Sequence, residues 1–209
     1  DIVDEKVKKI RQTLANFSIV AEKELTMKIS NLKSDYTLTG ASPYDSRSGY
    51  SVKQIEIKGE PEFSMLMKNL KVNTVSSVEN DLLKSSIISE ADEIETMEAQ
   101  KKYKLNDVLF DFKIDNLDIA SFEALQRVDV DDEQAINALS QKIISKGITM
   151  DIKKFSIKKV SENGKTMDGF TISSSLAIDK SFDISTTAQN PLALLNALST
   201  KTNISVSTA

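Results

Sequence analysis

The chain of 209 residues contains no cysteine, no histidine and no tryptophan. Without cysteine, disulfide bonds, zinc–thiolate sites and thiolate catalysis are excluded. Without histidine, the commonest general base and the commonest transition-metal ligand are missing, so neither a Ser-His-Asp triad nor a histidine metal site can form within this chain. We therefore expect no metal and no other cofactor.

Glycine and long apolar runs are also scarce. Six glycines leave little room for phosphate-cradling loops, and the chain has no P-loop, no G-x-G-x-x-G and no G-x-S-x-G motif. No apolar run approaches the roughly 18 residues of a membrane-spanning helix. The net charge of −4, with both signs interspersed, lacks the basic field that nucleic-acid binding requires, so no nucleic-acid partner is expected.

What is present indicates a globular, β-rich chain. Hydrophobic residues make up 40% and charged residues 28% of the sequence, which is typical of a chain that buries a core. We expect a single domain over residues 1–209. Because the chain begins with Asp1 rather than Met, we expect a fragment of a longer chain from which an N-terminal signal or anchor has been removed.

The most informative pattern is a repeated break in strand alternation. In four segments apolar residues alternate with period two and then restart three residues after the last apolar position. The restarts are Leu32, Leu70, Leu117 and Phe155, and the residues before them are Asn31, Asn69, Asn116 and Lys154. One extra residue indicates a β-bulge or a sharp bend, and Asn tolerates the backbone conformations that a kink requires. The pattern predicts a degenerate internal repeat of long, bent strands.

Further strands are expected between these units. They cover residues 54–58, residues 82–96 (where a helix is the alternative), residues 170–178 and the alternating end of the chain from Ile204. Asn163-Gly164 is a strong hairpin signal. Residues 40–52 form a polar, turn-rich stretch that predicts a mobile loop, with Val52 inside it because Val52 is out of phase with the following strand.

Four helices are expected from apolar spacing and capping residues. They cover residues 2–15, residues 122–127 capped by Ser121, residues 132–146 capped by Asp131 and ended by Gly147, and a last helix from Asn190-Pro191 through Leu198. The expected fold class is α+β: long, bent antiparallel strands form a curved sheet, with amphipathic helices packed on one face.

Three charged clusters favour ordinary structural explanations. The acidic residues 129–133 lack the glycine of a calcium loop and fit a helix N-terminus. The acidic run from Glu90 to Glu98 fits a solvated face, although paired carboxylates in a cleft are the alternative. Four lysines at 153, 154, 158 and 159 fit the protection of an edge strand, with an anionic-lipid contact as the alternative.

Two segments resemble the YdgA-like bacterial family of unknown function. They run from Phe112 to Gln126 and from Ile144 to Ile157, followed by Asn163-Gly164 and the strand near 170–178. The resemblance spans about residues 60–200 and implies a periplasmic protein of the Gram-negative envelope, tethered to the inner membrane by its N-terminus. That family has no assigned catalytic residues, so the resemblance implies none here. Its strands are similar in style to AsmA-like envelope proteins, which use a curved sheet as a lipid groove.

The expected function is therefore a non-enzymatic envelope protein that acts as a scaffold or binds an apolar, lipid-like ligand in the concavity of the sheet. Candidate partners are a lipid or another envelope protein. The candidate lining residues are Met27, Met65, Met67, Phe110, Phe112 and Met150. Ordinary core packing explains the same residues, since methionine also fills irregular cores. A carboxylate-based hydrolase and an assembly or adhesion module remain the alternatives.

Overall fold

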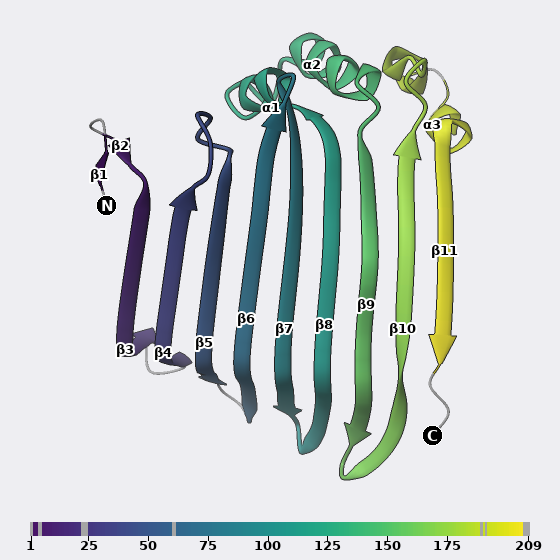
Figure 1. The fold of residues 1–209 in the computed structure, drawn as a ribbon. Helices are drawn as coiled ribbons and strands as arrows, with labels where there is room; N and C mark the ends of the chain where they lie inside the picture. The colour runs from purple at the N-terminus through teal and green to yellow at the C-terminus, as the bar shows by residue number, and fades with distance from the viewer. Residues whose placement is uncertain are drawn as a thin grey trace.

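The computed structural model describes residues 2–3, 6–21, 25–59, 62–188, 190 and 192–206. Its dominant element is an open, nine-stranded antiparallel sheet in which strands that follow one another in sequence, β3 to β11, are also neighbours in space (Figure 1). A separate small hairpin joins β1 (Ile2–Val3) and β2 (Lys6–Val7). The expected α+β class with long antiparallel strands is confirmed.

The strands are unusually long for a globular domain, in which about five to six residues is typical. β8, for instance, has 18 residues. The bounds are Lys9–Ala21 (β3), Leu25–Leu38 (β4), Ser46–Gly59 (β5), Phe63–Glu79 (β6), Leu82–Glu98 (β7), Lys101–Asp118 (β8), Thr149–Glu162 (β9), Lys165–Ile178 (β10) and Leu198–Val206 (β11). The alternation that the sequence shows over residues 82–96 and near the C-terminus therefore belongs to strands, as expected.

The helices gather at one end of the sheet (Figure 1). They are α1 (Ile119–Leu125), α2 (Glu133–Ser145), the 3₁₀ helix η1 (Ile184–Ala188) and α3 (Ala193–Ala197). α1 and α2 connect β8 to β9, while η1 and α3 connect β10 to β11.

The capping residues differ from those expected. The Asp118 carboxylate, rather than Ser121, caps α1 by accepting a hydrogen bond from the Ser121 backbone N–H at 2.8 Å. Asp132, rather than Asp131, caps α2. Gly147 follows α2 with φ of 73°, as its role as a stop signal predicts. The last helix is shorter than expected because residues from Leu198 onward form β11, and Pro191 lies outside the described residues.

The predicted helix over residues 2–15 is wrong. Residues 9–21 form the edge strand β3, and the described residues before it form the hairpin of β1 and β2. The apolar spacing mimics a helix because a step of four, from Ile10 to Leu14, equals two strand repeats. The step of three from Leu14 to Phe17 crosses an irregularity of the strand, so a helix-like stripe arises from a kinked strand.

The predicted mobile loop over residues 40–52 is also largely wrong. β5 begins at Ser46, and Val52 pairs with Leu32 and Leu70 instead of lying in a loop. The remaining turn is held by the Asp45 carboxylate, which accepts hydrogen bonds from the backbone N–H groups of Ser42 at 3.2 Å and Val78 at 2.7 Å. The turn is thereby fixed to the neighbouring strand β6.

The hairpin signal is confirmed, whereas the edge-strand interpretation of the lysines is wrong. Asn163 and Gly164 have φ of 49° and 84° and join β9 to β10, as a turn with two positive φ values requires. β9 lies between β8 and β10, so its lysines do not protect an edge. Lys153 and Lys158 instead form ion pairs, the second with Asp107 of β8 at 3.3 Å.

All four breaks in alternation coincide with irregular backbone. Asn31, Asn69 and Asn116 have positive φ values of 52°, 52° and 61°. The fourth break falls where the register of β9 against β8 shifts between Lys154 and Ile152. The kinks that the sequence predicts are therefore present, although they do not all lie at the same height in the sheet.

A row of irregular residues crosses eight strands at one height, and we call this row the seam. The seam consists of Ala15, Asn31, Lys53, Asn69, Asp92, Asp107, Lys158 and Gly169. At each member the ladder skips the residue and then resumes with the same register. Asn31, Asn69 and Asp107, on alternate strands, have positive φ. Because eight of the nine strands are interrupted at the same level, the sheet bends as a whole, and Figure 1 shows the strands bending near the end away from the helices.

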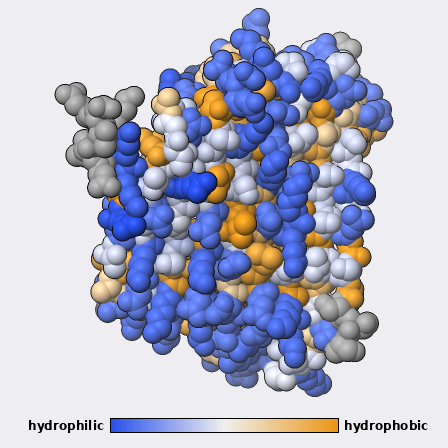
Figure 2. Space-filling model, viewed as in Figure 1, coloured by the Kyte–Doolittle hydropathy of each residue, from blue (hydrophilic) through white to orange (hydrophobic). Residues whose placement is uncertain are grey.

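The seam also keeps the apolar side chains on one face. An irregular residue shifts the alternation by one position, so apolar residues above and below the seam point the same way despite the break in phase. The opposite face carries mostly polar residues on both sides of the seam, such as Lys33, Ser51 and Lys71 above it and Lys68 and Glu93 below it. Figure 2 shows a largely hydrophilic face with a hydrophobic patch near its centre. The sheet thus has an apolar face and a polar face.

Candidate functional site

The apolar face is built from rows of cross-strand neighbours, which share a face because they lie directly opposite each other. The row next to the seam, on the side of the helices, is apolar in eight consecutive strands. Its members are Leu14, Leu32, Val52, Leu70, Ala91, Val108, Ile157 and Phe170. Val52, Ala91 and Ile157 are only 7%, 4% and 6% exposed, so the bend buries the centre of this row.

Four phenylalanines form an aromatic cluster on the apolar face. The ring of Phe110 stacks on that of Phe112 at 6.0 Å between centroids and meets Phe155 edge-on at 6.3 Å. Phe155 in turn meets Phe170 edge-on at 5.8 Å. These distances and angles are those preferred by aromatic pairs. All four rings remain half-buried, so the cluster presents apolar surface to whatever lies above it.

The six candidate lining residues all lie on the apolar face and none is buried. Met27 and Met65 share a row with Ile57 between them, and Met67 lies one row nearer the seam. Phe110 and Phe112 belong to the aromatic cluster on the other side of the seam. Met150 pairs with Ile114 near the helical end. The structure places these residues on one continuous face, and their contact with a ligand stays a prediction.

The apolar face lacks the second layer that usually covers a sheet. The accessible surface of the chain is 13920 Å². A compact monomer of 23.1 kDa exposes roughly 9,700 Å². Among the described residues only six hydrophobic side chains are buried, and none of the large ones is fully buried. The helices occupy one end of the strands, so most of the sheet is a single layer (Figure 1).

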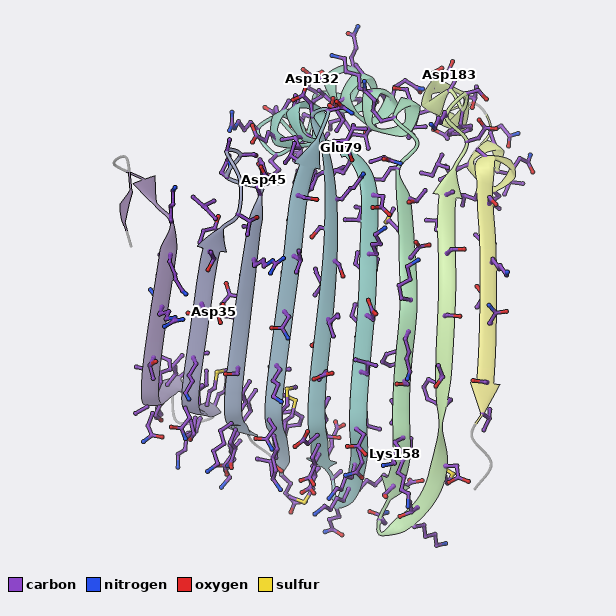
Figure 3. All side chains as sticks on the ribbon, viewed as in Figure 1. Asp35, Asp45, Glu79, Asp132, Lys158 and Asp183 are labelled. Atoms are coloured by element: carbon purple, nitrogen blue, oxygen red, sulfur yellow. The ribbon has the colours of Figure 1, made fainter. Side chains whose placement is uncertain are left out.

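The polar face carries ion pairs that link neighbouring strands. Below the seam, the Glu93 carboxylate of β7 bridges Lys68 of β6 at 2.7 Å and Lys104 of β8. Hydrogen bonds from Lys104 first, and from Lys68 second, hold the pKa of Glu93 below its usual value. Lys102 and Glu95 add a further pair at 2.8 Å between β8 and β7. Figure 3 shows charged side chains projecting along the whole length of the strands.

Two hollows lie along the seam. One has a volume of about 430 Å³ and contains Glu90, Asp92 and Asp107 together with Lys154 and Lys158. Glu90 and Asp92 come from the acidic run, and Asp107 of β8 is paired with Lys158, which Figure 3 labels near the lower part of β9. The other hollow has a volume of about 330 Å³ and lies between β4, β5 and β6.

Nothing in the described residues favours carboxylate-based hydrolysis. Such chemistry needs a carboxylic acid with a raised pKa beside a second carboxylate. Every described carboxyl group whose pKa departs from its ordinary value is instead lowered, as in Glu56, Glu93 and Asp118. Within the described part of the chain, no group of three or more acidic side chains could hold a metal ion.

The sequence interpretation missed most members of the seam. Six of them were not identified, namely Ala15, Lys53, Asp92, Asp107, Lys158 and Gly169. The signal was present, because each lies between two apolar residues that are three positions apart, such as Val52 and Ile55 around Lys53. Treating Val52 as part of a loop concealed this slip. The hollows and their lysines follow from the seam, so they were missed as well.

No protein-family model matches this chain, and neither a curated protein nor a solved structure matches it. The resemblance to the YdgA-like family therefore stays a prediction. No helix in the described residues combines the length and the apolar character needed to cross a lipid bilayer.

Proposed function

We propose that the chain is a non-enzymatic protein that binds an apolar, lipid-like ligand along its apolar face. The single observation that supports this most is a largely apolar face, with four clustered phenylalanines and four methionines, that no second layer of the described chain covers. Exposed apolar patches of this kind typically mark binding surfaces. Methionine side chains adapt to ligands of irregular shape.

The place of action belongs to the same proposal. A lipid-binding protein of the Gram-negative envelope, held at the inner membrane by an N-terminal anchor and facing the periplasm, agrees with the sequence resemblance and with the lack of cysteine. A scaffold that holds another envelope protein on the same face is the alternative within this class. An assembly module that adds strands at the edge of the sheet relies on the exposed edge strand β3 instead.

The direct test is extraction of the purified protein with organic solvent, followed by mass spectrometry of the extract. We expect a co-purified lipid or fatty acid in stoichiometric amount, and fluorescent fatty acid should bind saturably to the delipidated protein. Absence of both signals would reject the proposal. A scaffold for another protein would give neither signal and would be recognised by a bound polypeptide instead.

Two substitutions in β8 test which face of the sheet binds the ligand. Phe112→Glu places a charge in the aromatic cluster, whereas Leu109→Glu places the same charge beside the larger hollow on the polar face. We expect the first to weaken fatty-acid binding at least tenfold and the second to change it less than twofold. Phe112→Ser serves if the charged variant does not fold, as judged by circular dichroism. Equal effects of Phe112→Glu and Leu109→Glu would contradict a site on the apolar face.

A further inference from the structure

The smaller hollow on the polar face, which we call the cationic hollow, collects positive charge without negative charge. Its polar lining consists of Lys33, Lys53, Lys71, Asn31, Asn69 and Ser51. No carboxylate lines it, whereas the larger hollow farther along the seam contains three carboxylates and two lysines. The concentration of lysines is notable in a chain whose net charge is −4.

The register of the strands explains why the three lysines line the same hollow. Ser51 of β5 lies directly opposite both Lys33 of β4 and Lys71 of β6, so the two lysines flank it on the same face. Two strand spacings separate their backbones, which is about 10 Å. Lys53 belongs to the seam two residues along β5 and lines the same hollow. All three lysines therefore line one depression.

The positive charges of the cationic hollow have no ion-pair partner within the described chain. Neither Lys33, Lys53 nor Lys71 forms an ion pair with any described residue, in contrast to Lys68 and Lys104 just below the seam. The carboxylates closest in register lie beyond ion-pair distance. Glu90 lies opposite Lys71 and Asp35 lies two residues after Lys33, yet neither forms an ion pair with these lysines.

Several hydrogen-bond donors in the cationic hollow have no acceptor among the described residues. The Asn69 amide already donates to the Asp92 carboxylate at 2.7 Å. The three ammonium groups and the Ser51 hydroxyl make no hydrogen bond to a described residue. Ammonium groups and a hydroxyl around one depression match an anion with several acceptor oxygens and more than one negative charge.

We propose that the cationic hollow binds a phosphate group carried by a larger molecule. Phosphate supplies several acceptor oxygens and a charge near −2, which suits three lysines that line one hollow better than a single carboxylate does. The hollow of about 330 Å³ also leaves room for the group to which the phosphate is esterified. This inference is independent of the proposed lipid-like ligand, because it concerns the opposite face of the sheet.

The test measures binding of inorganic phosphate to the whole chain by calorimetry or NMR titration at neutral pH and low salt. We expect saturable binding that weakens as salt increases, since the lysines are exposed. Lys53→Gln should weaken binding at least tenfold. Lys154→Gln removes the same charge from the larger hollow and should change binding less than twofold. The double variant Lys33→Gln/Lys71→Gln serves if Lys53→Gln does not fold.

Two further binding measurements identify the kind of molecule that carries the phosphate. Glycerol phosphate represents a soluble ester, and vesicles containing phosphatidic acid represent a lipid headgroup, with pure phosphatidylcholine vesicles as the comparison. Stronger binding to either of the first two, sensitive to Lys53→Gln, supports the proposal and names the source. The proposal is overturned if no phosphate probe binds saturably, or if Lys154→Gln weakens binding as much as Lys53→Gln does.

Discussion

Individual residues of the seam have the side chains that their backbone positions demand. Asn31, Asn69 and Asp107 adopt positive φ, and among residues with a side chain Asn and Asp tolerate this region best. Gly169 is required for another reason. A Cβ atom there would lie 1.6 Å from the Ile157 carbonyl oxygen and 2.5 Å from its carbonyl carbon, so the backbones of β9 and β10 approach each other too closely for any side chain.

The substitution Gly169→Ala should therefore destabilise the protein. The added methyl group meets backbone rather than a flexible side chain, so relief requires movement of β9 against β10, at a cost of about 1–3 kcal/mol. Urea denaturation followed by circular dichroism measures the change. Ser175→Ala, in a regular part of the same strand, is the matched control and should stay within about 0.5 kcal/mol of the wild type. An unchanged midpoint for Gly169→Ala would contradict the close approach.

The same residues show how far sequence reasoning reached at this scale. Asn before a restart of the apolar pattern was a sound indicator, since Asn31, Asn69 and Asn116 all have positive φ. The register of the strands could not be predicted, because the residues around each Asn do not show that Asn31 and Asn69 share a row whereas Asn116 lies outside it. In β8 the residue that lies in that row is Asp107, not Asn116. Which residues share a row depends on pairing between strands far apart in the sequence, and that pairing depends on the whole sheet.

At the scale of elements, the meander of long strands is held together by neighbouring pairs rather than by a packed second layer. Cross-strand contacts such as the Glu93 bridge from β6 to β8 contribute to that cohesion. Glu93 is the central acceptor, and both lysines lower its pKa. A carboxylate whose folded pKa is lowered stabilises the fold above its unfolded pKa of about 4.3, and this stabilisation is lost as the pH falls through the folded value.

The substitution Glu93→Gln should lower stability at pH 7 by roughly 1 kcal/mol, the scale of two partly exposed ion pairs. Because the stabilisation from ionised Glu93 is lost as the pH falls from the unfolded pKa of about 4.3 through the lowered pKa of the folded protein, the difference between the two proteins should shrink in acid. Urea midpoints at pH 7 and pH 3 measure it. Glu98→Gln, at the exposed end of the same strand, is the control and should show little change at either pH. A difference that is constant with pH would exclude the electrostatic origin.

The elements themselves were predictable to different degrees. Strands with clean alternation and the Asn163-Gly164 hairpin follow from local chemistry, and both are confirmed. The N-terminal stretch failed because kinked strands and helices share apolar steps of three and four residues. Only pairing with β4 makes residues 9–21 a strand, and such tertiary context overrides local spacing. The cationic hollow was unpredictable for the same reason, since three strands supply its lysines.

At the scale of the whole molecule, the sheet divides its two faces by chemistry. The apolar face is left largely open, and the polar face carries ion pairs and two hollows along the bend. An ordinary domain packs a second layer against such an apolar face, and that second layer is missing from the described chain. We expect an occupant of the apolar face to stabilise the protein markedly, because anything that binds only the folded state adds its binding free energy to stability.

The free energy of unfolding of the ligand-free chain should therefore depend less on urea than that of a compact protein of the same mass. The unfolded chain exposes roughly 33,500 Å², so this fold buries about four-fifths of what a compact protein of the same mass buries. The urea m-value scales with that buried area and should be reduced in proportion. An occupant of the apolar face should raise both the midpoint and the m-value towards those of a compact protein. If the m-value equals that of a compact protein at every protein concentration, the apolar face is already covered within one chain. If the m-value rises with protein concentration, a second copy of the chain covers the apolar face.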